Sequence, residues 1–133
     1  VARWLEAHPD VATVSYSGLP SSPWYAAGQK YAPKGVGAVL SFELKGGVDA
    51  GRALVDSVEL FSHVANIGDV RSLIIHPAST THSQLTPEQQ LTSGVTPGLV
   101  RLSVGLENID DIIADLEAGF AAARAGLAAN AAV

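Results

Sequence analysis

Short apolar runs alternate with polar, turn-rich segments along this 133-residue chain. The runs Ser72 to His76 and Leu99 to Val104 are rich in Ile, Leu and Val and are bounded by Pro or Gly, which is typical of short, largely buried strands. Val11 to Tyr16 and Gly35 to Leu44 also favour strands, and Phe61 to Asn66 is strand-like. The pattern therefore predicts a sheet of four or five strands.

Apolar residues at helical spacing, together with helix-capping residues, lie between these runs. Helices are expected over Trp24 to Tyr31, Val48 to Val58 and Thr86 to Thr92, the last with a threonine N-cap and a proline at its first position. The clearest helix should begin after Asn108, its N-cap, and stop at Gly126. Strands interleaved with helices predict an α/β or α+β domain with helices against one face of the sheet.

Arg101 is the one charged residue inside the run Leu99 to Val104. Side chains alternate between faces along a strand, so Leu99, Arg101 and Ser103 share one face while the other face is plain core. A buried guanidinium must be paired, and the pattern alone favours an ion pair with one of the domain's own carboxylates. The alternative is a bidentate grip on the carboxylate of a ligand. The pattern leaves both interpretations open.

The composition of the chain is that of a globular domain. With 47% hydrophobic and 16% charged residues the chain is too apolar to be disordered, and 133 residues suffice for one globular domain. No apolar run is long enough to span a membrane. The net charge of −5 and the scattered basic residues argue against nucleic acid as a partner. The absence of cysteine excludes disulfides, thiolate chemistry and cysteine-based zinc sites.

The remaining candidate motifs, for metal binding, nucleophilic catalysis and phosphate binding, are incomplete. The four histidines have no pair at the i, i+4 spacing of a helical zinc site, and no G-x-S-x-G motif accompanies them, so structural or loop-capping roles are favoured. Gly35 and Gly37 precede a strand and lack the lysine of a phosphate-binding loop, which favours turn or close-packing roles. The three lysines, Lys30, Lys34 and Lys45, lie in polar or turn contexts where the amine stays protonated.

Three stretches resemble a known domain: YSGLPSSPWYAAGQKYAPKGVGAVLSFELKGG, SLIIHPASTTH and PGLVRLSVGLE. They are similar, in order and over nearly the whole chain, to the C-terminal domain of the cystathionine γ-synthase-like pyridoxal-phosphate enzymes of cysteine and methionine metabolism. The resemblance implies an α+β fold, the small C-terminal domain of a fold-type I enzyme, with a largely antiparallel sheet and helices against one face. Residues 1–9 would end an interdomain helix, 10–127 would form a substrate-clamping domain, and 128–133 would be a frayed tail.

The same resemblance assigns site residues. Arg101 matches the arginine that binds the substrate α-carboxylate, which reverses the preference for an ion pair. Asn66 falls where lyase and synthase members carry the serine of a Ser-Leu-Gly-Gly turn, and its amide is a substrate-binding candidate. Ser72 is a further candidate, for which a turn or strand-end role is the alternative. The Schiff-base lysine and the cofactor's other contacts belong to an N-terminal domain absent from this sequence, so that domain is expected to bind pyridoxal 5′-phosphate, and this chain alone should be inactive.

The implied reaction of the whole enzyme is a γ-replacement in methionine biosynthesis. HPASTTHSQL and the Ala65 to Asp69 turn are most similar to the members that convert O-acetylhomoserine and sulfide, or a thiol, to homocysteine or a thioether plus acetate. Family habit implies a cytoplasmic homotetramer acting on a small amino acid. The alternatives are a domain of a cystathionine γ-synthase or γ-lyase, and a free-standing module that binds a small carboxylate or a protein partner.

Overall fold

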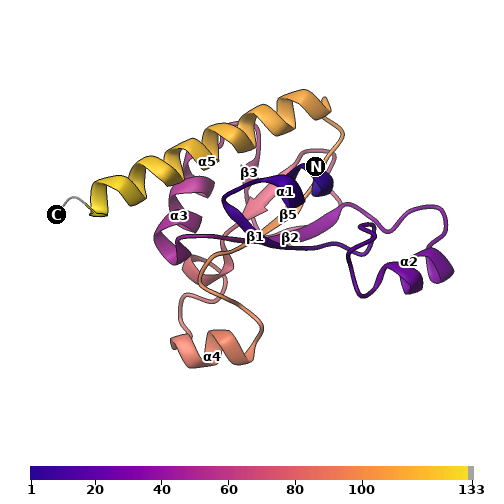
Figure 1. Cartoon of the computed structure of the whole chain (residues 1–133), viewed down its shortest axis with the longest axis horizontal. Coiled ribbons are helices and arrows are strands. Elements are labelled where there is room, and N and C mark those ends of the chain that lie inside the picture. Colours follow the sequence, from indigo (N-terminus) through magenta and orange to yellow (C-terminus); the bar gives the residue numbers. More distant parts are fainter. Residues whose placement is uncertain (132–133) are drawn as a thin grey trace.

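The computed structural model describes residues 1–131. Its helices and strands follow one another in the order shown in Figure 1: α1 (Ala2–Ala7), β1 (Val11–Ser15), α2 (Tyr25–Tyr31), β2 (Val39–Leu44), α3 (Gly47–Ser57), β3 (Ser62–His63), β4 (Leu73–Ile75), the 3-10 turn η1 (Pro77–Ser79), α4 (Pro87–Thr92), β5 (Leu99–Ser103) and α5 (Ile109–Ala131). No helix among these residues has the length and hydropathy needed to cross a membrane.

The five strands form one sheet in the order β1-β2-β5-β4-β3. Three of the four pairings are antiparallel, and only β3 runs parallel to its neighbour β4. The prediction of a largely antiparallel sheet in an α+β fold is confirmed. The strand that carries Arg101 is the central one, paired on both edges with other strands.

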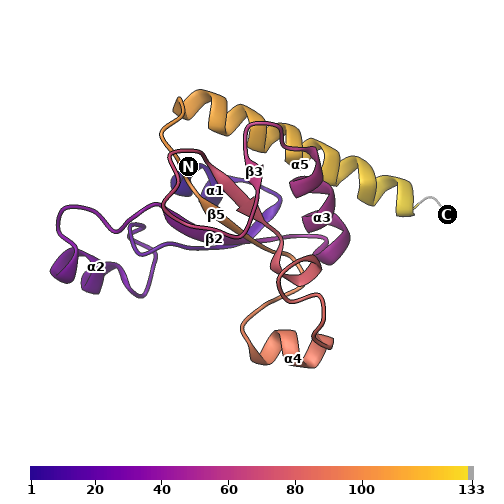
Figure 2. The same ribbon diagram turned by 180° about the vertical axis from the view of Figure 1, so that it is seen from behind.

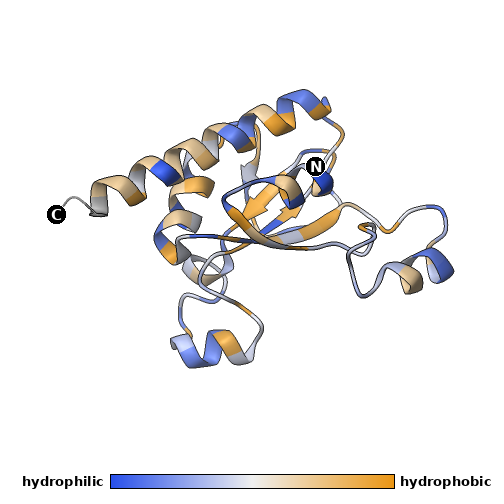
Figure 3. Ribbon diagram, viewed as in Figure 1, coloured by the Kyte–Doolittle hydropathy of each residue, from blue (hydrophilic) through white to orange (hydrophobic). Residues whose placement is uncertain are grey.

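One face of the sheet is buried under helices α1, α3 and α5. Strand alternation sends Leu40 and Phe42 of β2, and Val100 and Leu102 of β5, to this face, where all four are buried. Phe120 of α5 lies on them, with its ring centroid 5.8 Å from that of Phe42. Figures 1 and 2 show α3 and α5 together on this side, while α2 and α4 project away from the sheet. Hydrophobic colouring accordingly concentrates on the strands, and α4 is largely hydrophilic (Figure 3).

Two predicted strands are shorter in the structure. The strand expected from Gly35 begins only at Val39, because Gly35 and Gly37 have φ angles of +138° and +87°, outside the extended region. The N–H of Gly35 closes a turn by donating to the Ala32 carbonyl at 3.0 Å, and no atom beyond the adjacent residues lies within 4 Å of the position of a Cβ at either glycine. The segment expected as a strand over Phe61 to Asn66 is extended only at Ser62–His63, because the following residues turn back, the Asn66 N–H donating to the Val64 carbonyl at 3.1 Å.

The last helix begins as predicted and ends later. Asn108 is its N-cap, its Oδ1 accepting from the Asp110 N–H at 2.8 Å. The predicted stop at Gly126 is wrong, since the helix continues to Ala131. A lone helical glycine costs only about 1 kcal/mol relative to alanine, and the alanines around it are the strongest helix formers. Residues 128–131 of the expected tail are thus helical, and residues 132–133 lie outside the described residues.

Candidate functional site

Arg101 lies on the face of the sheet that the core helices leave uncovered. In the strand pairing it stands opposite Ser41 of β2 on one side and Ile75 of β4 on the other. Its side chain borders a hollow of about 570 Å³. The lining comes from four strands and from the segments around η1 and after α4, and includes Ser15, Ser41, Ile75, His82, Val95 and Arg101. Arg101, which is half-buried, therefore borders a hollow on the uncovered face of the sheet.

Within the described residues, the guanidinium of Arg101 makes a single hydrogen bond. Its Nη2 donates to the backbone carbonyl of Asn66 at 3.1 Å. Within residues 1–131, no carboxylate oxygen lies within 4.0 Å of its nitrogens. The ion-pair interpretation therefore has no partner in the described part of the chain. The remaining donors of the planar fork have the geometry to hold a carboxylate by two parallel hydrogen bonds.

Asn66 is brought next to Arg101 by the turn that follows β3. Its side chain is exposed, and its Oδ1 accepts from the N–H of Ile67 at 2.8 Å. The contact with the guanidinium uses the backbone carbonyl of Asn66, which can only accept a hydrogen bond. Binding of substrate by the Asn66 side-chain amide stays a prediction.

Ser72 has contacts of a different kind. It is fully buried just before β4, and its hydroxyl donates to Oε2 of Glu107 at 2.8 Å while accepting from the N–H of Gly105 at 2.9 Å. Its backbone N–H donates to Oε1 of Glu107 at 2.6 Å. These are the contacts of a strand end, the alternative role considered for this residue, and its contact with substrate stays a prediction.

Sequence reasoning missed several residues that line the hollow. Ser41 lies between two core residues of β2, so alternation puts it on the face of Arg101 once the β2 to β5 register is known. Thr81 and His82 follow η1, where the hydroxyl oxygen of Thr81 lies 2.8 Å from Nδ1 of His82. The alternation of Ser41 was readable from the sequence, but the register and the path after η1 were not.

His76 is a core residue, in agreement with the expected structural role. Its ring is fully buried, with Nδ1 2.8 Å from the hydroxyl of Ser79 and Nε2 2.7 Å from the carbonyl of Pro97. Burial lowers the pKa of His76 below its ordinary value, because a charged imidazole is disfavoured away from water, and the hydrogen bond to Pro97 only partly opposes this. The residue is therefore neutral and structural.

The residues of this chain do not by themselves fit pyridoxal phosphate. An aldehyde cofactor of this kind is held by a lysine amine, and no lysine borders the Arg101 hollow. The Nζ of Lys45 donates to the carbonyl of Pro9 at 2.6 Å, and that of Lys30 lies 5.0 Å from the ring centroid of Tyr31. Among the described residues, the hollow beside Arg101 therefore lacks a lysine that could hold this cofactor.

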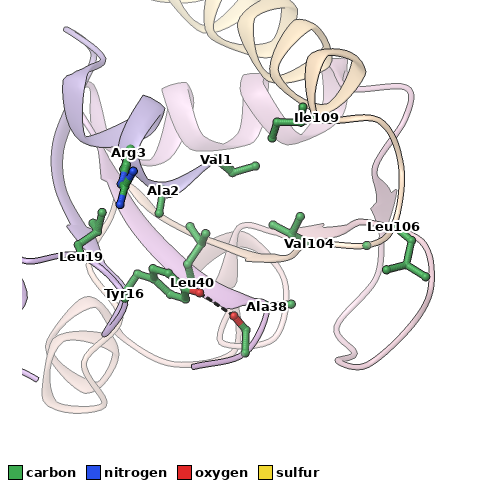
Figure 4. A pocket seen from close by; sticks show the side chains of 13 residues that line it. Val1, Ala2, Arg3, Tyr16, Leu19, Ala38, Leu40, Val104, Leu106 and Ile109 are labelled. Atoms are coloured by element: carbon green, nitrogen blue, oxygen red, sulfur yellow. Dashed lines mark hydrogen bonds between the residues drawn. The ribbon is translucent and has the colours of Figure 1, made fainter. Parts of the chain in front are cut away.

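A second hollow, of about 550 Å³, lies beside α1 (Figure 4). Its lining is mainly apolar, with Leu19, Leu40, Val104 and Ile109 among its residues. The hydroxyl of Tyr16, its main polar group besides Arg3, is already bonded to the carbonyl of Gly37 at 2.8 Å. This hollow carries no pair of groups suited to catalysis, so the Arg101 face is the better candidate site.

Comparisons with known proteins identify relatives of the chain. The chain is 57% identical over 118 residues to the O-acetyl-L-homoserine sulfhydrylase of Leptospira meyeri and 56% identical over 122 residues to that of Corynebacterium glutamicum. These matches cover 88% and 92% of this chain but only 27% and 28% of the two relatives. The chain thus spans little more than a quarter of their length.

Two solved structures have the same fold as this chain. The cystathionine gamma synthase of Xanthomonas oryzae pv. oryzae in complex with cystathionine superposes with a TM-score of 0.83 and 42% identity, over 94% of this chain and 32% of that one. A Campylobacter jejuni protein provisionally assigned as an O-acetylhomoserine (thiol)-lyase, which holds N′-pyridoxyl-lysine-5′-monophosphate, superposes at 0.82 with 45% identity, over 90% and 28%. The family described as Cys/Met metabolism PLP-dependent enzyme matches residues 1–121. The chain therefore belongs to the family of PLP-dependent enzymes of cysteine and methionine metabolism.

Proposed function

We propose that this chain is the substrate-clamping domain of an enzyme that converts O-acetylhomoserine and sulfide, or a thiol, to homocysteine or a thioether and acetate in methionine biosynthesis. The observation that carries the proposal is the guanidinium of Arg101, which faces the uncovered side of the sheet without a carboxylate partner in residues 1–131. The similarity to sulfhydrylases that act on this class of substrate gives the reaction.

The proposed task of Arg101 is to orient the substrate. Two N–H groups of the fork bind the two oxygens of the α-carboxylate, and the rigid central strand fixes where the amino acid lies. The bond from Nη2 to the Asn66 carbonyl restricts rotation of the fork. Asn66, through its amide, and Ser72 are the further candidate contacts. None of these groups is proposed to transfer a proton.

A domain outside this chain is proposed to bind the cofactor. Residues 10–127 form the clamping domain and residues 1–9 the end of the helix that joins it to a cofactor-binding domain outside this chain. The proposal includes a homotetramer in the cytoplasm, an arrangement supported by family resemblance, and light scattering of the full-length protein tests its mass. Because no lysine borders the hollow, the chain alone is expected to be inactive.

A cystathionine γ-synthase or γ-lyase is the alternative. It is favoured by the TM-score of 0.83 to a cystathionine gamma synthase, and the chain is also 50% identical to a lyase that acts on another amino acid, the L-methionine gamma-lyase of Porphyromonas gingivalis. The full-length protein, supplied with pyridoxal phosphate, should be assayed with O-acetylhomoserine and sulfide, with cysteine in place of sulfide, and with cystathionine or methionine alone. Rapid homocysteine formation from the first pair supports the sulfhydrylase proposal, and turnover only of the others supports the alternative.

Replacement of Arg101 tests the carboxylate role. In the full-length protein Arg101→Ala should lower kcat/KM for O-acetylhomoserine by about 10²- to 10⁴-fold, because two charge-assisted hydrogen bonds are lost, while cofactor absorbance is retained. Arg52→Ala, which removes an exposed arginine of α3, is the matched control and should keep wild-type activity. Near-normal kcat/KM in Arg101→Ala would contradict the proposed role.

A further inference from the structure

We propose that Glu107 is a positioning residue that sets the place of the Arg101 guanidinium through the segment from Asn66 to Ser72. The inference rests on the proposed carboxylate role of Arg101 and extends it to a residue outside the hollow.

The guanidinium of Arg101 and the group that accepts its hydrogen bond lie in different parts of the fold. Arg101 leaves the rigid centre of the sheet, but the acceptor of its Nη2 is the carbonyl of Asn66, in an irregular segment. The side chains from His63 to Arg71 are exposed, apart from a half-buried Asp69. Exposed backbone with few buried contacts belongs to the least stable parts of a fold. The position of the Asn66 carbonyl therefore depends on what fixes the far end of this segment.

Glu107 fixes that end. Its two carboxylate oxygens accept from the backbone N–H and the hydroxyl of Ser72, at 2.6 Å and 2.8 Å. Two more bonds join the same short segments: the N–H of Gly105 donates to the Ser72 hydroxyl at 2.9 Å, and the N–H of Leu106 donates to the Val70 carbonyl at 2.8 Å. Four hydrogen bonds thus fasten residues 70–72 to residues 105–107.

Gly105 permits this close approach. A Cβ at this position would lie 2.4 Å from the Val70 carbonyl oxygen and 2.5 Å from the carbonyl carbon of Arg71, both backbone atoms that cannot move aside like a flexible side chain. Residues 105–107 begin two positions after Ser103, the last residue of β5, which is the strand of Arg101. The contacts therefore close a ring that runs from Arg101 along β5 to Glu107, across to Ser72, and back along the chain to the Asn66 carbonyl.

The charge of Glu107 strengthens the ring. Burial acts to raise the pKa of Glu107, but hydrogen bonds from the backbone and hydroxyl of Ser72 and from its own N–H outweigh burial and the nearby Asp69, and the pKa lies below its ordinary value. The carboxylate is therefore ionised at neutral pH. Its bonds to Ser72 are charge-assisted, and such bonds are roughly twice as strong as those between neutral groups.

The test uses Glu107→Gln in the full-length protein. Glutamine is similar in size but offers one acceptor instead of two, so one donor of Ser72 then faces an NH₂ group. KM for O-acetylhomoserine should rise about tenfold while KM for sulfide and cofactor absorbance stay unchanged, since a displaced fork binds carboxylate less well. Asp110→Asn, which removes the same charge from an exposed side chain three residues later, is the matched control and should keep the wild-type KM.

Two further readouts separate positioning from general loss of structure. Amide hydrogen exchange over residues 64–72 should accelerate in Glu107→Gln and stay at the wild-type rate in Asp110→Asn. In Gly105→Ala the added methyl group would clash with the backbone of Val70 and Arg71 and push residues 70–72 away from residues 105–107. This variant should reproduce both the rise in KM and the faster exchange. It gives an independent result even if Glu107→Gln does not fold.

The outcomes separate this inference from the proposed function. If Arg101→Ala raises KM for O-acetylhomoserine but Glu107→Gln and Gly105→Ala leave KM and exchange at wild-type values, the positioning role of Glu107 is overturned and the carboxylate role stands. If Arg101→Ala itself leaves KM unchanged, the proposed function fails, and this inference falls with it.

Discussion

The buried imidazole of His76 makes the free energy of unfolding depend on pH. The contacts of the ring determine the direction of this dependence. Nε2 lies 2.7 Å from the carbonyl of Pro97, which can only accept, so Nε2 carries the proton and Nδ1 accepts from the hydroxyl of Ser79. Burial lowers the pKa of His76 below its ordinary value of 6.5. The folded protein therefore holds this ring neutral at pH values where the unfolded chain would protonate it.

The sign and size of the effect follow from proton binding. Between the folded and the unfolded pKa of His76 the unfolded state binds more protons, so the free energy of unfolding falls as the pH falls. The contribution of His76 is complete above its unfolded pKa and decreases at lower pH by up to about 1.4 kcal/mol per pH unit. His76→Gln keeps an N–H donor for the Pro97 carbonyl and does not titrate.

The assay is urea unfolding of the 133-residue chain at pH 7.5, 6.5 and 5.5, followed by tryptophan fluorescence. Trp4 packs against Phe120, with ring centroids 5.8 Å apart, so its emission reports loss of the core. The other histidines are present in both proteins, and their contributions cancel in the difference. Wild type should lose more stability than His76→Gln between pH 6.5 and 5.5. Parallel pH curves for the two proteins would refute the assignment of a neutral, buried ring.

Two further predictions concern the packing of α5. Asp115→Ala should lower the free energy of unfolding by about 2 to 3 kcal/mol, because the Asp115 carboxylate accepts from the N–H groups of residues 59, 60 and 61 at 2.9, 3.0 and 3.3 Å. Phe120→Ala should lower it by about 3 to 5 kcal/mol, since the ring is fully buried in the core. Urea unfolding at pH 7.5 measures both, and a loss below about 1 kcal/mol in either variant would contradict the packing described.

The sequence predicted those features that depend on neighbouring residues. The alternation along β5 placed Arg101 on the face opposite the core, and Thr86 and Asn108 were identified as N-caps, both confirmed by their hydrogen bonds. The resemblance added the family and the fold. Periodicity, capping and motif similarity are local signals, and they were sufficient for the order and type of most elements.

The sequence did not predict contacts between distant segments. The bond from Arg101 to Asn66 joins residues 35 positions apart, and so does the pair of bonds from Ser72 to Glu107. Both depend on the order of strands and on the path of an irregular segment, which hydrophobic periodicity does not encode. The strand predicted over residues 61–66 was too long for the same reason. Its apolar content favours a strand, but the backbone turns between Val64 and Asn66.

The contact between Arg101 and Asn66 also bears on how this position can change during evolution. The guanidinium binds the main-chain oxygen of residue 66, an atom that every amino acid possesses. Substitution at this site therefore does not remove the acceptor, provided that the chain keeps its path. Selection on this contact acts on the course of the backbone, set by residues that lie elsewhere, and the identity of residue 66 is left free to drift or to acquire a separate role toward the ligand.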